Sequence, residues 1–212
     1  MIERAWPRLA ATMIAVACGA ATLSSTGCGG PASAPAAADS VAVSSTVSHE
    51  QGEVKPPAAD VAIELQPVDR AAFDALVAEQ KGKVVLVDFW ATWCIPCLAQ
   101  LPHTAEVAKK HADDGLVVMT VSLDEPEDGA KAAAQLAKRV GDAPVMHLHS
   151  NLGGGSEAME AFEITSGSAP HYKLYDRSGK LREVFEVDPA AERAFTAEDI
   201  DAAVEKLLKE AG

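Results

Sequence analysis

Two cysteines stand three positions apart near the middle of the chain, in the segment Cys94-Ile95-Pro96-Cys97. Cysteines at this spacing, placed where a strand turns into a helix, can form a disulfide without movement of the scaffold. The free N–H groups of a helix start stabilise a thiolate on Cys94 and lower its pKa, which makes Cys94 the nucleophile. Cys97, one turn inside the helix, is then expected to be the shielded thiol that resolves a mixed disulfide on Cys94.

The spacing alone leaves two alternatives open. A CxxC pair is also half of a zinc site, but the sequence has no second CxxC and no well-spaced His-x-x-x-His to complete four ligands. A purely structural disulfide is the other alternative, because an exported domain tolerates one. The residues around the pair must decide among redox, metal and structural roles.

The segments on either side of the pair predict a strand and a helix. Residues 84–90 are almost continuously apolar, as expected of a strand that is buried on both faces. A helix is expected to begin at the turn between the two cysteines and to continue towards Ala112, with a bend at Pro102. The pair would therefore lie at the carboxyl end of a buried strand.

The rest of the chain from residue 68 onward alternates between helical and strand patterns. We expect helices over residues 68–79, 127–140 and 156–162 and from Thr196 onward, and strands over 116–123, 145–149, 171–175 and 181–187. Thr196 is expected to cap the last helix, with Asp199 three residues further on. This order predicts an α/β fold in which one mixed central sheet has helices on both faces.

The sequence around the pair resembles the thioredoxin superfamily. Residues 90–97 read WATWCIPC, follow Val-Asp-Phe, and precede Pro102, which lies five residues beyond Cys97. With the export signal described below, and with the insertion between the third strand and the hairpin, the chain resembles the TlpA/ResA type of membrane-tethered thiol-disulfide oxidoreductase. The resemblance covers about residues 62–210. It implies a thioredoxin-like fold, a redox-active Cys94–Cys97 disulfide, and no other cofactor.

The resemblance also implies roles for three residues away from the pair. Pro170 is where the family's cis-proline is expected, and Ala169 before it would pair with a substrate strand through backbone hydrogen bonds. Asp88 matches the carboxylate that lies behind the resolving cysteine and assists its proton transfer. Burial should raise the pKa of Asp88 towards neutrality, which suits a general base. The alternative is an Asp at a strand edge that faces water.

The residues nearest the nucleophile are expected to contact the substrate. Trp93 offers a flat docking surface, and Pro96 is expected to contribute to the same surface. Ile95 makes the turn bulkier and more apolar than does the Gly of ordinary thioredoxin. Gln100 departs from the family type, which often has Glu three residues after the second cysteine. Because Gln does not titrate, an acid-base role for this position is in doubt.

We expect no metal site. His147 and His149 alternate along a predicted strand and could share one face, but a metal would need further ligands. His103 and His171 are expected to be surface or partly packed residues. A copper chaperone of the Sco type is a weak alternative, because that type has three residues between its cysteines and this chain has two.

The first part of the chain has the pattern of bacterial export. Residues 1–27 are expected to be a lipoprotein-type signal peptide, with Cys28 as the lipidated first residue of the mature protein. Lipidation at Cys18 and ordinary secretion are the alternatives. Residues 28–60 are rich in Ala, Ser, Pro and Gly and are expected to be a flexible tether. Residues 61–212 then form the thioredoxin-like domain, on the extracytoplasmic side of a bacterial membrane.

Charge and composition narrow the partners. A formal net charge of -13 over 212 residues argues against nucleic acid. By resemblance, the expected partners are disulfide-containing exported proteins, with apocytochrome c among the candidates, and an external membrane electron donor. Ile95 and Pro96 offer neither a charge nor a side-chain donor to stabilise the thiolate, which favours a reductant. A disulfide oxidant or isomerase on the same fold is the alternative.

Overall fold

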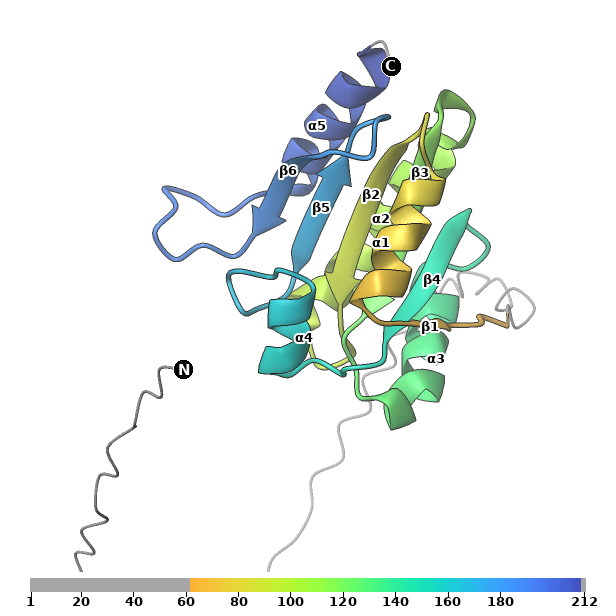
Figure 1. The fold of residues 1–212 in the computed structure, drawn as a ribbon, viewed down its shortest axis with the longest axis vertical. Coiled ribbons are helices and arrows are strands. Elements are labelled where there is room, and N and C mark those ends of the chain that lie inside the picture. The colour runs from red at the N-terminus through yellow and green to blue at the C-terminus, as the bar shows by residue number, and fades with distance from the viewer. Residues whose placement is uncertain (1–61, 211–212) are drawn as a thin grey trace, which may run out of the picture. The chain divides into compact units, whose positions relative to one another are not determined.

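The computed structural model describes residues 62–210, which form one sheet with helices on both faces (Figure 1). The strands are β1 Gln66–Val68, β2 Val84–Trp90, β3 Leu116–Ser122, β4 Val145–Ser150, β5 His171–Tyr175 and β6 Leu181–Glu186. The helices are α1 Arg70–Glu79, α2 Ile95–Lys110, α3 Gly129–Arg139, α4 Ser156–Ala161 and α5 Ala197–Lys209, with short 3₁₀ turns at Ala112–Asp114 and Pro126–Asp128.

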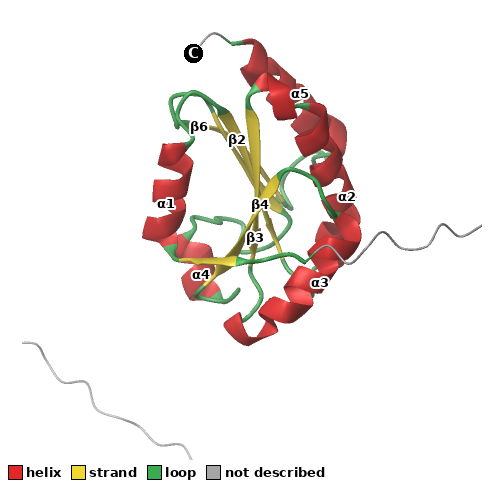
Figure 2. Cartoon of the chain, turned by 90° about the vertical axis from the view of Figure 1, so that its right-hand side faces the viewer, coloured by secondary structure: helices red, strands yellow, loops and turns green. Residues whose placement is uncertain are grey.

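The sheet is mixed, in the order β1-β4-β3-β2-β5-β6. Strands β1, β4, β3 and β2 run parallel, β5 pairs antiparallel with β2, and β6 pairs antiparallel with β5. Figure 2 shows α1 and α4 on one face and α2, α3 and α5 on the other. The predicted fold class is confirmed.

The central position of β2 explains its apolar sequence. All seven of its residues are buried, because β3 and β5 pair with its edges and helices cover its faces. On the side of α1 and α4, the rings of Phe73, Phe89 and Phe162 meet at centroid distances of 5.6 to 5.7 Å. On the opposite side, Leu86 packs with Val204 of α5. The carboxyl end of β2 is therefore held rigidly where the cysteines follow.

Helix α2 continues through Pro102. Proline has no N–H, so the carbonyl of Leu98, four residues earlier, loses its helical partner. The Nε of Arg139 from α3 donates to this carbonyl at 3.0 Å. A polar group left unpaired by the proline thus ties α2 to the next helix.

Some boundaries differ from those predicted. Strand β1 was not predicted, because three residues at a sheet edge have too short a pattern. The helix expected from residue 68 begins at Arg70, after Asp69 caps it by accepting from the N–H of Ala72 at 2.8 Å. The helix expected from residue 127 begins at Gly129, after a 3₁₀ turn. The capping box of Thr196 and Asp199 is present.

The predicted signal peptide, Cys28, Cys18 and the tether lie outside the described residues. Within residues 62–210, no helix is both long enough and apolar enough to cross a membrane.

Candidate redox site

Cys94 and Cys97 form a disulfide at the start of α2, with their Cα atoms 5.3 Å apart. Cys94 is the N-cap residue, and its sulfur accepts a hydrogen bond from the N–H of Cys97 at 3.2 Å. The exposed fraction is 5% for Cys94 and 1% for Cys97. On reduction, a Cys94 thiolate would remain next to free helix N–H groups, which is the arrangement that lowers a thiol pKa.

Apolar side chains project into solvent beside the disulfide. Trp93 is 56% exposed and Ile95 is 73% exposed, and Pro96 is exposed as well. Large apolar side chains at such exposure are uncommon among the described residues, where Val184 and Val187 are the other two. The three residues next to Cys94 therefore offer an apolar surface to whatever approaches its sulfur.

The Ala169–Pro170 peptide bond is cis, at the position where the sequence predicted it. It immediately precedes β5, whose first residue, His171, pairs with Phe89 of β2. Because the two strands are antiparallel, Pro170 lies at the same end of the sheet as the redox turn. Pro170 is buried, and Ala169 packs against the core cluster that contains both cysteines.

Asp88 is buried within β2, with 1% of its surface exposed, so the alternative of a water-facing Asp is wrong. The Thr104 hydroxyl donates to Oδ2 at 2.7 Å, whereas Oδ1 has no hydrogen-bond partner among the described residues. Burial raises the pKa of Asp88 to about 7, and the nearby hydroxyls of Thr104 and Tyr172 offset only part of this rise. A carboxyl group with this pKa can accept and return a proton near neutrality.

Tyr172 and Gln100 extend the polar network around Asp88. Tyr172 faces Asp88 across the β2–β5 ladder, is buried, and donates its hydroxyl hydrogen to Oε1 of Gln100 at 2.9 Å. Burial raises the pKa of the Tyr172 hydroxyl, and the charge of Asp88 raises it further. No local sequence pattern singles out Tyr172, because its role depends on the pairing of two strands that are distant in the chain.

A second buried carboxylate, Asp124, lies next to the redox turn and was also missed. It follows β3, the parallel neighbour of β2, and accepts hydrogen bonds from Thr92 and Ser122. The available signal was a polar residue directly after a buried strand, since parallel strands end at the same edge of a sheet. Reading that signal required knowing that β3 lies beside β2.

The four histidines that were considered have local partners or are fully buried. His147 bonds Thr120 at 2.9 Å, His149 bonds the Asp124 carbonyl at 3.0 Å, and His103 pairs with Asp201 at 3.0 Å. Burial lowers the pKa of both His147 and His171 to about 4. The expectation that His171 is a surface or partly packed residue is wrong. Its side chain is fully buried against Phe89, with Nδ1 3.5 Å from Oε2 of Glu186, and neither ring nitrogen has a hydrogen-bond partner among the described residues.

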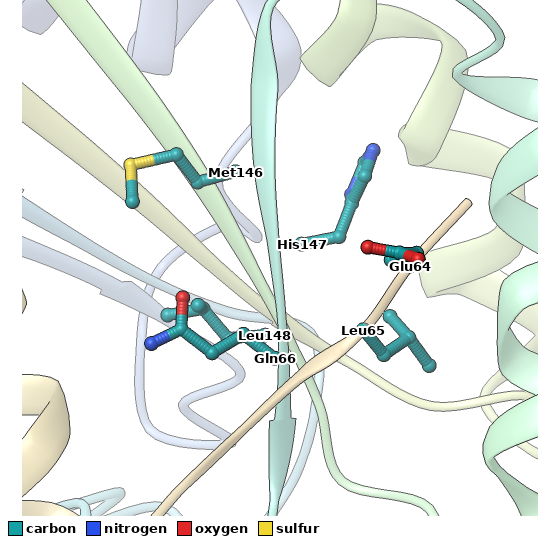
Figure 3. Close-up of a pocket in the computed structure, with 6 residues that line it drawn as sticks. All are labelled: Glu64, Leu65, Gln66, Met146, His147 and Leu148. Carbon is teal, nitrogen blue, oxygen red and sulfur yellow. The ribbon is translucent and has the colours of Figure 1, made fainter.

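The pocket beside β4 does not gather metal ligands. Figure 3 shows Met146 on one side of β4, with His147 and Glu64 on the other. Within residues 62–210, no cluster of three or more His, Cys, Asp or Glu side chains is placed to hold a metal ion.

The chain has relatives among thiol-disulfide oxidoreductases. ResA of Geobacillus kaustophilus, a thiol-disulfide oxidoreductase, is 24% identical over 132 residues, which are 62% of this chain and 67% of that protein. ResA of Oceanobacillus iheyensis is 37% identical over 51 residues, or 24% of this chain and 27% of that protein. The aligned parts thus span from about a quarter to two thirds of these relatives.

A solved structure and a family model also match the domain. A Chlorobium tepidum protein described as a thiol:disulfide interchange protein DsbE has a TM-score of 0.50 and 24% identity, and the match covers 62% of this chain and 84% of that one. This similarity concerns the fold. The Redoxin family model matches residues 58–204, which is more than half of the chain. The resemblance to the thioredoxin superfamily is confirmed, and the chain belongs to the Redoxin family.

Proposed function

We propose that this protein is a thiol-disulfide oxidoreductase that reduces disulfides in exported proteins. The observation that carries the proposal is the Cys94–Cys97 disulfide at the start of α2, which is flanked by the exposed side chains of Trp93 and Ile95 and has the buried carboxyl group of Asp88 in the preceding strand β2. A purely structural disulfide would not need exposed apolar neighbours or a carboxyl group that titrates near pH 7.

The reaction proceeds in two exchanges and transfers two electrons. In the reduced protein, the Cys94 thiolate attacks a substrate disulfide, forms a mixed disulfide and releases one substrate thiolate. Asp88 accepts the proton of Cys97, whose thiolate attacks the sulfur of Cys94. The second substrate thiol leaves, and the Cys94–Cys97 disulfide forms. An external donor must then return two electrons to the pair.

The substrate is held on two sides of Cys94. Trp93, Ile95 and Pro96 supply an apolar surface, and Ala169 offers its backbone groups to an extended segment of the substrate. These contacts suit a chain that has partly lost its fold, because such a chain exposes both apolar side chains and unpaired backbone. Exported proteins with cysteine pairs, such as apocytochrome c, fit this description.

The direction of electron flow follows from what lies between the cysteines. Ile95 and Pro96 add no charge and no side-chain donor, so a Cys94 thiolate has only amide groups and the helix start to stabilise it. The midpoint potential is expected near the thioredoxin value of about -270 mV and far from the value of about -120 mV of a strong oxidant. A titration with glutathione buffers distinguishes these values, and a potential above about -160 mV would favour an oxidant or isomerase.

The activity itself is tested by reduction of insulin with dithiothreitol. The wild-type protein should accelerate precipitation of the insulin chains, and Cys94→Ser should abolish the acceleration. Cys97→Ser is the matched variant, since it keeps the nucleophile and should accumulate mixed disulfides in place of turning over. Equal activity of Cys94→Ser and wild type would show that the pair is not the redox site.

The proposed location is the bacterial cell envelope. Cys28 would carry the lipid anchor, and residues 28–60 would hold the domain away from the membrane, where an external donor reaches it. Mass spectrometry of the membrane fraction should find acyl chains on an N-terminal Cys28. A mature form that begins elsewhere with an unmodified amino group would contradict the anchor. Partners trapped on Cys97→Ser in cells would identify substrates and donor.

A further inference from the structure

Asp88 and Asp124 are the only carboxylates among the described residues with buried side chains. Asp88 accepts the proton of Cys97 in the exchange reaction, whereas Asp124 takes part in neither exchange. Burial of a second carboxylate is costly unless its hydrogen bonds compensate the loss of water. We therefore expect the buried carboxylate of Asp124 to have a role of its own.

The hydrogen bonds of Asp124 converge on the segment that leads into the redox turn. The Thr92 N–H donates to Oδ1 and Oδ2 at 3.1 and 3.0 Å, and the Thr92 hydroxyl donates to Oδ1 at 2.6 Å. The Ser122 hydroxyl donates to Oδ2 at 2.8 Å. Oδ1 thus accepts from Thr92 alone and Oδ2 from both Thr92 and Ser122, so Thr92 is held two residues before Cys94.

The loop that carries Asp124 is itself fixed on both sides. The N–H of Leu123 donates to the carbonyl of Trp90 at 2.8 Å, and His149 bonds the Asp124 carbonyl at 3.0 Å. Gly154 lies so close that a Cβ there would be 2.3 Å from the Leu123 carbonyl oxygen and 3.2 Å from Cζ2 of Trp93. The carboxylate cannot move away from the turn without disturbing these contacts.

The charge of Asp124 acts over a short distance on an otherwise uncharged segment. Thr92 and Cys94 can be at most about 7 Å apart along the chain, so the carboxylate lies within roughly 12 Å of Cys94. From Phe89 to Ala105, His103 is the one ionisable side chain besides the cysteines. A buried charge is screened little by salt at this range, so it opposes formation of a thiolate on Cys94.

We propose that Asp124 is a positioning residue that holds the redox turn through Thr92 and whose negative charge keeps the Cys94–Cys97 pair reducing. The inference deepens the proposed function, because a charge that disfavours the Cys94 thiolate favours the disulfide over the reduced form. The electron pair is then passed more readily from the protein to its substrate. Ser122 and Thr92 supply the donors that allow the carboxylate to stay buried so close to the site.

The test compares midpoint potentials of full-length proteins in glutathione buffers. Asp124→Asn keeps the shape of the side chain and removes its charge. The exchange equilibrium with glutathione should therefore shift three- to tenfold towards the reduced protein, which raises the midpoint potential by about 15–30 mV for a two-electron couple. Alkylation of reduced Cys94 by iodoacetamide at pH 7 should become faster in parallel. Glu125→Gln, which removes an exposed charge from the same loop, should change neither quantity.

An unchanged or lower potential in Asp124→Asn, with only a loss of stability, would overturn the proposal. If that variant does not fold, Thr92→Val serves as the test. It removes the hydroxyl that donates to Asp124, so the negative charge of Asp124 is less compensated and acts more strongly on Cys94. Its potential should become more negative, and an unchanged or higher value would again overturn the proposal. Since each result is a difference from wild type, it is independent of whether the wild-type potential supports a reductant.

Discussion

The hydroxyl of Tyr172 donates its hydrogen to Gln100, 2.9 Å away, while Oδ1 of Asp88, its neighbour across the β2–β5 ladder, has no partner among the described residues. A neutral donor aimed at a carboxylate lowers its pKa. Gln100 therefore takes the Tyr172 hydroxyl hydrogen, so Tyr172 and Thr104 offset only part of the rise in the Asp88 pKa that burial causes. The residue that replaces a titratable Glu thus still affects the proton chemistry of the site.

The first prediction concerns Gln100→Leu. Loss of the amide frees the Tyr172 hydroxyl to turn towards Asp88, so the pKa of Asp88 should fall from about 7 by about one unit. Carbon NMR of the labelled Asp88 carboxyl group measures this shift. Adding Tyr172→Phe to Gln100→Leu should abolish it. An unchanged pKa in the single variant would mean that the hydroxyl does not reorient.

The second prediction concerns stability and pH. Asp88 has a pKa of about 7 in the folded protein and close to 4 in the unfolded chain, so the folded state binds more protons between these values. Stability therefore falls as the pH rises from about 4 to 7 and stays low above. Asp88→Asn removes this loss and should stabilise the oxidised protein at pH 8 by up to about 4 kcal/mol, with no such gain below pH 4.

Denaturant unfolding at pH 4 and pH 8 measures the difference. Asp113→Asn, at an exposed carboxylate, is the control and should show no comparable dependence on pH. A gain for Asp88→Asn of equal size at both pH values would assign the effect to packing and not to the buried charge.

The third prediction separates the chemical role of Asp88 from its effect on stability. In Asp88→Asn, Cys97 loses its proton acceptor, so the mixed disulfide should persist longer. Loss of a general base costs on the order of 10²–10⁴-fold, and a thiol exchange lies towards the lower end of this range. Single-turnover kinetics from pH 6 to 9 measure the resolving step. Identical profiles for variant and wild type would leave Asp88 with a structural role alone.

The fourth prediction uses two adjacent glycines. A Cβ at Gly154 would meet the Leu123 carbonyl and the ring of Trp93, so Gly154→Ala should destabilise the protein by about 1–3 kcal/mol and change the fluorescence of Trp93. A Cβ at Gly155 would meet nothing within 4 Å, and its φ is -75°, so Gly155→Ala should stay within about 0.5 kcal/mol of wild type. Thermal unfolding followed by fluorescence compares the two, and equal effects would contradict the close approach at Gly154.

Local pattern predicted most of the fold, and together with the family resemblance it identified the reacting cysteines. The apolar run of β2, the cysteine spacing and the proline before β5 were each visible in a short stretch of sequence. Asp124 and Tyr172 were not, because each acquires its role from a strand pairing between segments that lie far apart in the chain. Sequence reasoning thus identified the groups that exchange electrons, and the structure was needed to find those that surround them.

The bond between Arg139 and the Leu98 carbonyl has a consequence for how the redox helix is aligned. Pro102 leaves the Leu98 carbonyl of α2 without its helical donor, and the guanidinium of Arg139 on α3 donates to this carbonyl instead. This hydrogen bond therefore sets the position of α2 along its axis relative to α3. In Pro102→Ala, the restored N–H would donate to the Leu98 carbonyl within α2, and the hydrogen bond that aligns α2 with α3 would be lost.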